Sequence, residues 1–393
     1  MMAQLSSGGK TMKRMQKHSM QKRSTQKQKK SASPKVYVLE PVMTDDEIKE
    51  LEGTYFDEKA IRNLIDHDAD VYAADANAPG GKRLLAKFRK NVFSPEIVEL
   101  AWDAFHKAAA PSRNRGAAAG PIDLKSMYWK KRKPVEIEKW SARYIQDGKA
   151  SKMRVNNNVF SSVLGYFEKT PFMGLPCRLT SYTQTYFKNY KKGLPFIRAI
   201  DRQFKTLVPQ SHKKQLARIA STPAYQIADT AFSSVTINRN FRTALHQDAG
   251  DFREGFGNLS VVEYGKYHGG VTVFPRYGVG FDLRSRDFIA MDVHEWHCNT
   301  ALYETDSDKE YNKTLEKVYS HDASTGTKGS EFRFSRISFV CYVREKLIEC
   351  NTADTTKYYN RIRFDPMYGK IADSDTDSDT DSDTDSDTDT SNK

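Results

Sequence analysis

The sequence predicts an α+β protein whose core is a jelly roll, or double-stranded β-helix, supported by helices. After residue 230 the chain contains short segments rich in β-branched and aromatic residues, broken by Gly, Asn and Asp, which is typical of a sandwiched antiparallel sheet. Before that point, longer stretches carry apolar residues at helical spacing. A chain of 393 residues is long enough to bury such a core without the support of disulfides.

Five regions are expected along the chain. Residues 1–35 carry ten Lys and Arg and no acid, whereas residues 373–393 alternate Asp with Ser or Thr and contain nine Asp and one Lys. We expect both tails to be disordered, because such polar chains cannot offset the entropy lost on folding. Between the tails we expect a helical N-terminal part (36–170), the β core (171–350) and a C-terminal extension (351–372).

Start and stop signals place the helices. In "FSPEIVELAWDAFHKAAAP", Ser94 is the expected N-cap, Pro95 takes the first helical position and Pro111 closes the helix. Another helix is expected to start at Thr44, and "LPFIRAIDRQFKTLVPQSHKKQLARI" predicts two helices divided by Pro209. The expected strands are "FSSVTIN", "LSVVEY", "GVTVFP", "DFIAMDV" and "RISFVCYVRE".

The charge is uneven and predicts a polyanionic partner. The chain has a net charge of +12, and with both tails removed residues 36–372 still carry +10. Lys and Arg that displace counterions from phosphates stabilise a complex, so nucleic acid is the expected partner. Three basic stretches are candidates for phosphate contact: "YWKKRKP" (128–134), "YFKNYKKG" (186–193) and "SHKKQLAR" (211–218).

The cysteines and the hydropathy pattern indicate a soluble intracellular protein. None of the four cysteines, at positions 177, 298, 341 and 350, belongs to a C-x-x-C pair, so we expect buried free thiols in a reducing compartment. No apolar run is long enough to cross a bilayer, and no apolar segment follows the basic N-terminus as in a secretory signal. The basic arm is a candidate nuclear signal, so nucleus and cytoplasm both stay open, as does the oligomeric state.

A metal site is indicated by "RTALHQDAGD". Residues two apart on an extended segment project from the same face, so His246 and Asp248 can direct an imidazole and a carboxylate to one point. A second histidine from a neighbouring strand would complete a facial triad for iron(II). The stretch "DFIAMDVHEWHCNT" offers His294 and His297, and spacing alone admits either.

The next strand indicates the co-substrate. Arg336 begins the predicted buried strand "SRISFVCYVRE", where a guanidinium is costly unless it meets an anion. Its planar fork matches a carboxylate, and Ser338 adds a hydroxyl on the same face. Iron held by two His and one carboxylate, beside such a clamp, is what a 2-oxoglutarate oxygenase requires.

With these motifs, residues 170–345 resemble the catalytic core of the TET/JBP family. Its members are iron(II)/2-oxoglutarate dioxygenases that use O2 to hydroxylate the 5-methyl group of thymine or 5-methylcytosine in nucleic acid. The resemblance implies His246, Asp248 and His297 as iron ligands, and Arg336 and Ser338 as the 2-oxoglutarate clamp. The substrate would be nucleic acid, DNA before RNA, with the base flipped out or single-stranded.

The resemblance also implies three contacts to the base, at Asp251, Arg344 and Asn114. Arg344 stands where the cytosine-oxidising branch has a histidine. Arg can only donate hydrogen bonds, so with Asp251 it complements the carbonyls and N3–H of thymine, although Asp251 would also suit the amine of 5-methylcytosine. Arg344 and Asp251 pairing with each other is the alternative.

Two other functions remain candidates. The same chemistry could act on a protein side chain, which the basic charge disfavours. A catalytically inactive nucleic-acid-binding protein with this fold is the other, although such a copy is expected to have lost part of the triad or clamp.

Overall fold

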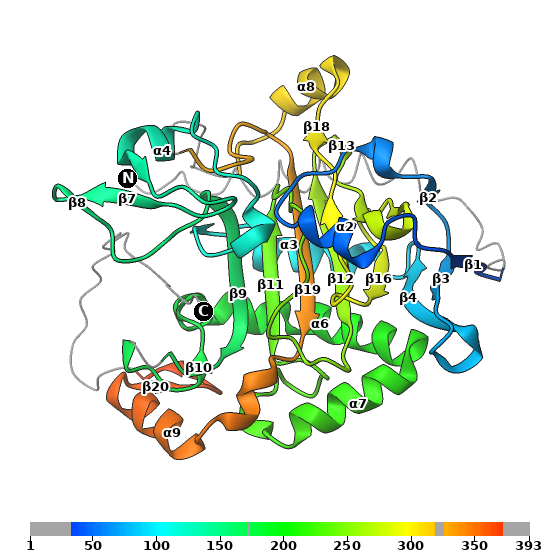
Figure 1. Cartoon of the computed structure of the whole chain (residues 1–393). Helices are drawn as coiled ribbons and strands as arrows, with labels where there is room; N and C mark the ends of the chain where they lie inside the picture. The colour runs from blue at the N-terminus through cyan, green and yellow to red at the C-terminus, as the bar shows by residue number, and fades with distance from the viewer. Residues whose placement is uncertain (1–32, 171–172, 319–325, 372–393) are drawn as a thin grey trace, which may run out of the picture. The chain divides into compact units, whose positions relative to one another are not determined.

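A computed structural model describes residues 33–170, 173–318 and 326–371, which form a mixed α/β structure (Figure 1). Contacts divide the chain into two units, Met1–Pro34 and Lys35–Lys393. The account below concerns the second unit. The basic arm and the acidic tail, apart from residues 33–35, lie outside the described residues, so the expectations for them stay predictions.

A ten-stranded sheet forms the centre of this unit. Except for the parallel pair of β1 and β3, its strands pair antiparallel. In sheet order the strands are β1 (Lys35–Leu39), β3 (Ala69–Ala74), β4 (Lys82–Arg89), β16 (Phe288–Met291), β12 (Gly257–Tyr264), β19 (Ser335–Tyr342), β11 (Ser234–Arg239), β9 (Val159–Phe167) and β10 (Arg178–Leu179), with β5 (Pro111–Ser112) beside β9.

A four-stranded sheet covers one face of this large sheet. Its order is β17 (Cys298–Asn299), β14 (Thr272–Phe274), β15 (Val279–Phe281) and β2 (Asn63–Ile65). An apolar core lies between the two sheets, with Phe88, Ile289 and Met291 from the large sheet packed against Phe274 and Phe281 from the small one. Burial of such side chains is the main free-energy gain that holds two sheets together.

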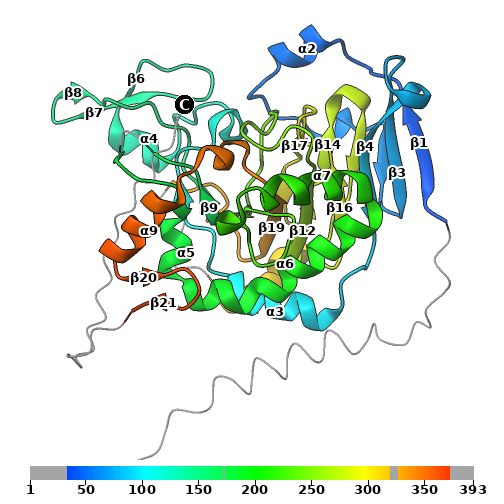
Figure 2. The ribbon, with the colours of Figure 1, turned by 90° about the horizontal axis from the view of Figure 1, so that it is seen from below.

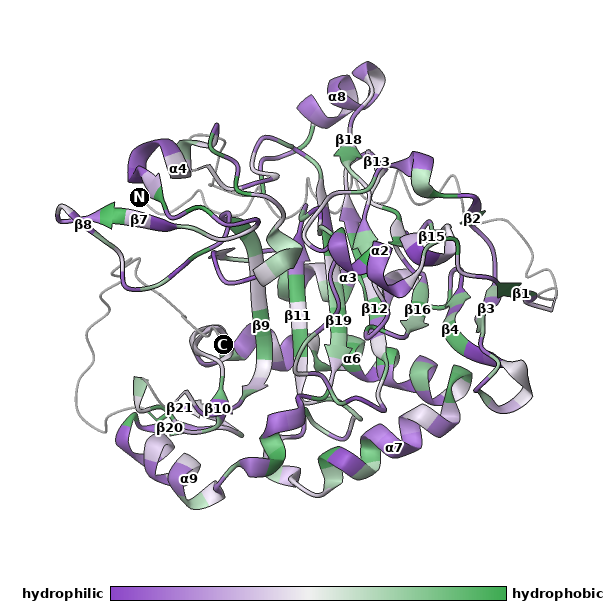
Figure 3. Cartoon of the chain, in the orientation of Figure 1, coloured by the Kyte–Doolittle hydropathy of each residue, from purple (hydrophilic) through white to green (hydrophobic). Residues whose placement is uncertain are grey.

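Helices cover the opposite face of the large sheet. Figure 2 shows α3 (Pro95–Phe105) and α6 (Phe187–Leu207) on one side of it and β14 and β17 on the other. A second core packs Phe105, Phe196 and Ile200 of these helices against Ile337 and Phe339 of β19. Figure 3 shows the hydrophobic residues along β9, β11 and β19 that this core requires.

The remaining elements are short and lie around these layers. The helices are α2 (Asp45–Glu50), α4 (Met127–Arg132), α5 (Ser181–Thr185), α7 (Pro209–Ala220), α8 (Asp306–Lys313) and α9 (Thr352–Arg361). The strands are β6 (Pro134–Val135), β7 (Arg143–Gln146), β8 (Lys149–Ala150), β13 (His268–Gly269), β18 (Leu302–Tyr303), β20 (Phe364–Asp365) and β21 (Gly369–Lys370).

The local signals for helices and strands are confirmed. Ser94 caps α3 and Pro95 begins it, although the helix ends at Phe105 and not near Pro111. Thr44 caps α2 in a reciprocal capping box with Glu47, and Pro209 separates α6 from α7. All five expected strands are present as β11, β12, β14, β16 and β19.

The expectation that residues 36–170 form a helical part is wrong. This range supplies β1, β3, β4 and β9 to the large sheet and contains only three α-helices, α2, α3 and α4. The segment "KRLLAKFR" of β4 illustrates why. Its polar residues break the apolar alternation, and its place between β3 and β16 comes from tertiary pairing, which can override a weak local pattern.

The expectation of four free thiols is wrong for two of them. Cys177 and Cys350 form a disulfide across 173 positions of sequence, with Cα atoms 5.8 Å apart. That distance suits a disulfide, and only the packing of the two segments creates it. Cys298 and Cys341 are buried and free, as expected.

No helix in the described part of the chain is both long enough and apolar enough to pass through a membrane.

Candidate active site

Two extended segments bring the three predicted iron ligands together. The backbones of His246 and His297 form an antiparallel bridge, each N–H donating to the other's carbonyl at 3.0 Å. The amide of Asp248 donates to the carbonyl of Val293, also at 3.0 Å. His246 and Asp248 therefore project from the same face of one segment, and the second segment presents His297 opposite them.

The three side chains converge on one point. One potential ligand atom from each lies within 4.8 Å of the others. The Nδ1 atoms of His246 and His297 lie 2.8 and 2.9 Å from the carbonyl oxygens of Ala244 and Glu295. A carbonyl only accepts, so each Nδ1 carries the proton and each Nε2 offers a lone pair, the arrangement that a metal-binding imidazole needs. This donor set fits iron(II).

The electrostatics of the cluster also fit a cation. Burial opposes charge on Asp248, but the adjacent imidazole of His246 and the nearby imidazoles of His297 and His294 lower its pKa to about 2. Burial and the proximity of His246 lower the pKa of His297 to about 4. The carboxylate is therefore ionised and the His297 imidazole neutral at physiological pH, as metal ligation requires.

His294 does not belong to this cluster. Its Nε2 lies 3.2 Å from the carbonyl oxygen of Phe252, and its backbone N–H donates to Asp292 at 3.1 Å. The short turn between Met291 and His297 thus directs His294 into hydrogen bonds of the loop. Of the two histidines that the sequence offers, the structure brings His297 to the point shared by His246 and Asp248.

Arg336 and Ser338 lie on the face of β19 that is turned away from the helices. Their neighbours Ile337, Phe339 and Cys341 fill the core beneath α3 and α6, so alternation directs the two polar side chains to the other side. Arg336 is 5% exposed, and its Nε has no hydrogen-bond partner among the described residues. No described carboxylate forms an ion pair with Arg336. A buried guanidinium without a partner is costly in free energy unless an external anion binds to it.

A glycine gives this guanidinium room. A Cβ added at Gly270 would lie 3.1 Å from the Nε of Arg336, and Gly270 has φ +69°. Any larger residue at this position would therefore be strained and would crowd the clamp.

The predicted base contacts Asp251 and Arg344 are adjacent but do not pair in the way considered above. Their backbones form a bridge. The guanidinium of Arg344, however, donates to both carboxylate oxygens of Glu168 and lies over the ring of Phe167, 4.1 Å from its centroid. Burial and the charge of Asp248 hold the pKa of Asp251 well above its usual value.

Asn114 lies in the loop that follows β5. The hydroxyl of Ser112 donates to its side-chain oxygen, and Asn156 anchors the loop by accepting from Gly116 at 2.7 Å. The charges of Arg344, Asp251 and Arg115 all act on the hydroxyl of Tyr342, whose pKa burial raises. The register places Ser112, where this loop begins, opposite Val159 and level with the start of β19, whereas Asp251 and Arg344 lie beyond the C-terminal end of β19.

Sequence reasoning missed Glu168. The signal available was weak, because a single acid after a buried strand resembles any surface residue at a strand end. Its role depends on register: Gly165 in β9, Ser234 in β11 and Tyr342 in β19 lie side by side, which brings Glu168 next to Arg344.

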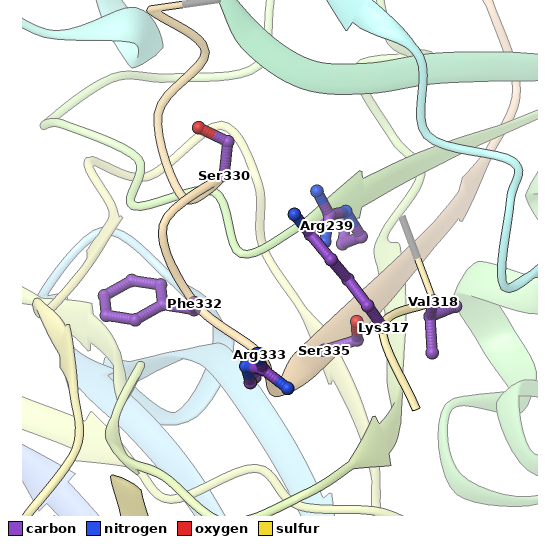
Figure 4. A pocket seen from close by; sticks show the side chains of 7 residues that line it. All are labelled: Arg239, Lys317, Val318, Ser330, Phe332, Arg333 and Ser335. Carbon is purple, nitrogen blue, oxygen red and sulfur yellow. The ribbon is translucent and has the colours of Figure 1, made fainter. Parts of the chain in front are cut away.

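A basic cavity of about 10 Å³ lies at the other end of β19, lined in part by Arg239, Lys317 and Arg333 (Figure 4). Figure 4 shows the side chain of Lys317 pointing toward Arg239. This cavity has room for one water molecule and not for a dicarboxylate or a base.

Residues 162–345 match the Tet_JBP family model, described as the oxygenase domain of the 2OGFeDO superfamily. The chain is 34% identical to thymine dioxygenase JBP1 of Trypanosoma brucei brucei over 168 residues, which are 42% of this chain and 19% of that protein. It is 29% identical to the bifunctional helicase and thymine dioxygenase JBP2 of Leishmania infantum over 208 residues, 51% of this chain and 16% of that protein.

Among solved structures, NgTET1 in complex with 5mC DNA aligns with a TM-score of 0.42 and 12% identity, over 82% of this chain and 99% of that one. The matched part of this chain spans less than one fifth of the length of the two curated relatives, JBP1 and JBP2. Residues 162–345, a little under half of this chain, are therefore similar to the oxygenase domain that the Tet_JBP family model describes.

Proposed function

We propose that this chain is an iron(II)/2-oxoglutarate dioxygenase that hydroxylates the 5-methyl group of a pyrimidine base in DNA. The observation that carries the proposal is a His-Asp-His cluster on the same side of the large sheet as a buried arginine without a described anionic partner. The names of the relatives support the substrate class, since those relatives are thymine dioxygenases.

The fold that we propose for the core is the double-stranded β-helix. The large and small sheets, each antiparallel except for one parallel pair at its edge, face each other across an apolar core. The ligands come from the segment that leads to β12 of the large sheet and from the residue that precedes β17 of the small one. A site built from two facing sheets supports a jelly roll, because the mouth of such a fold is where a small-molecule site is expected.

Each residue has a distinct task in the proposed reaction. His246, Asp248 and His297 would hold the iron, with both Nδ1–H groups fixed on backbone carbonyls so that the ring orientation is set in advance. Arg336 and Ser338 would bind the far carboxylate of 2-oxoglutarate through charge-assisted hydrogen bonds. The bound metal would supply oxidation of a C–H bond by O2, coupled to decarboxylation of 2-oxoglutarate to succinate.

The nucleic acid would present its base outside the helical stack, because a methyl group within a duplex cannot reach a buried metal. Of the three basic stretches, residues 128–134 are favoured for phosphate contact. Arg113, next to Asn114, donates to Tyr128 of α4 at 3.2 Å, so this stretch adjoins a predicted base contact. The stretch 186–193 lies in α6, which packs on the other face of the large sheet.

The direct test is an activity assay with nucleoside mass spectrometry. Purified protein with iron(II), ascorbate and 2-oxoglutarate would receive DNA that contains thymine or 5-methylcytosine. We expect a gain of one oxygen on one of the two bases, and none without 2-oxoglutarate. Peptide hydroxylation without an oxidised base would instead support a protein hydroxylase, and DNA binding without 2-oxoglutarate turnover would support an inactive binding protein.

A further inference from the structure

Glu168 and Arg344 form a half-buried pair at the end of the site that is predicted to hold the base. Their side chains are 18% and 15% exposed. Two hydrogen bonds join them, from Nε and Nη2 of Arg344 to the two oxygens of Glu168. The ring of Phe167, the residue before Glu168, covers the guanidinium from one side. The two hydrogen bonds to Glu168 and the contact with the ring of Phe167 together fix the orientation of the guanidinium plane.

The pair leaves part of Arg344 available. A guanidinium carries five N–H groups, and Glu168 accepts two, so two on Nη1 and one on Nη2 remain. A Cβ added at Gly250 would lie 3.7 Å from Nη2, and Glu345 donates its backbone N–H to the carbonyl of Gly250 at 2.8 Å. The available donors therefore adjoin the loop that runs from the metal ligand Asp248 to Asp251.

We infer that Glu168 is a positioning residue that makes the site select thymine over 5-methylcytosine. This inference rests on the proposed function. Held by Glu168, Arg344 presents only donors, which match the carbonyl oxygen O4 of thymine, while a carboxyl oxygen of Asp251 accepts from N3–H. In 5-methylcytosine an amine replaces O4, so donors of the base would face donors of the protein.

Charge gives Glu168 a second effect on selection. Without it, the guanidinium would be free to rotate and to pair with Asp251, whose backbone forms a bridge with that of Arg344. Asp251 would then no longer be available to N3–H, and the distinction between the two bases would be lost. A buried donor or acceptor without a partner typically costs enough binding free energy to change specificity roughly ten- to hundredfold.

The test compares kcat/KM for two single-stranded oligonucleotides that differ only in one thymine or 5-methylcytosine. We expect the natural protein to prefer thymine about tenfold or more, and E168Q to bring the ratio within about threefold. Because E168Q leaves the cation of Arg344 without its partner, the double variant E168Q/R344Q, which removes both charges, is measured in parallel and is expected to lose the preference too. The control D229N breaks an exposed ion pair with Arg198 and should keep the ratio of the natural protein.

A ratio that stays unchanged in E168Q, even with a lowered melting temperature, would show a merely structural ion pair and overturn the inference. Preference of the natural protein for 5-methylcytosine would also overturn it, while leaving the proposed dioxygenase intact. Oxidation of neither base would overturn the proposed function itself and the inference with it. Succinate formed without DNA, which does not involve the base, should be equal in the natural protein and in D229N.

Discussion

At the scale of single residues, the ring nitrogens decide which histidine binds metal. The Nδ1 of His297 is hydrogen-bonded to the carbonyl of Glu295, which leaves its Nε2 for the ligand cluster. The Nε2 of His294, in contrast, is hydrogen-bonded to the carbonyl of Phe252. We expect His297→Ala to lose stoichiometric iron after anaerobic loading, measured by elemental analysis, and His294→Ala to retain it. Retention in the first and loss in the second would reverse the assignment.

Arg336 gives a second prediction at this scale. Arg336→Met keeps the volume but removes the donors, so binding of 2-oxoglutarate should weaken by about 1.5–3 kcal/mol, roughly ten- to hundredfold in KM. Arg333→Met is a matched control, because Arg333 is exposed and its one hydrogen bond within the described ranges goes to the carbonyl of Lys313 at 3.4 Å. An equal rise in KM for both variants would argue against Arg336 as the clamp. Steady-state kinetics at saturating oligonucleotide measures the effect.

At the scale of elements, the close approach of α6 to α3 depends on a glycine inside a helix. A Cβ added at Gly193 would lie 2.0 Å from the Cζ of Phe105, which is buried beneath it. Gly193→Ala should therefore destabilise the protein by about 1–3 kcal/mol through overpacking, although alanine favours helix by roughly 1 kcal/mol. Urea denaturation measures this, with the exposed Lys205→Ala in the same helix expected near zero. Greater stability of Gly193→Ala would mean that α3 and α6 pack less closely than described.

At the scale of the whole molecule, net charge should govern DNA affinity. We expect Lys130→Gln/Lys131→Gln to weaken binding and to reduce the slope of log affinity against log salt by about one for each phosphate that is no longer neutralised. The variant Lys191→Gln/Lys192→Gln removes the same charge as the first variant. Its two positions lie on α6, away from the predicted site, so the slope should stay nearly unchanged. Fluorescence anisotropy at several salt concentrations measures both. Equal slopes for the two variants would refute this choice of DNA-binding face.

Much of the catalytic chemistry could be predicted without coordinates. The spacing of His246 and Asp248, and of Arg336 and Ser338, places each pair on one face of an extended segment, because alternation is a local property of the backbone. Helix caps such as Thr44 and Ser94 are local in the same way, since the capping side chain bonds within three residues. These features needed only neighbours in the chain, and the structure contains them.

What depends on distant residues was decided by the tertiary structure alone. The strands of residues 36–170, the disulfide of Cys177 with Cys350 and the pair of Glu168 with Arg344 all join segments far apart in sequence. Spacing left His294 and His297 open and only the resemblance favoured His297, which the bridge to His246 brings to the other two ligands. A local pattern fixes the direction in which a side chain points, but which partner it meets follows from strand order and register, and these are set by the packing of the whole core.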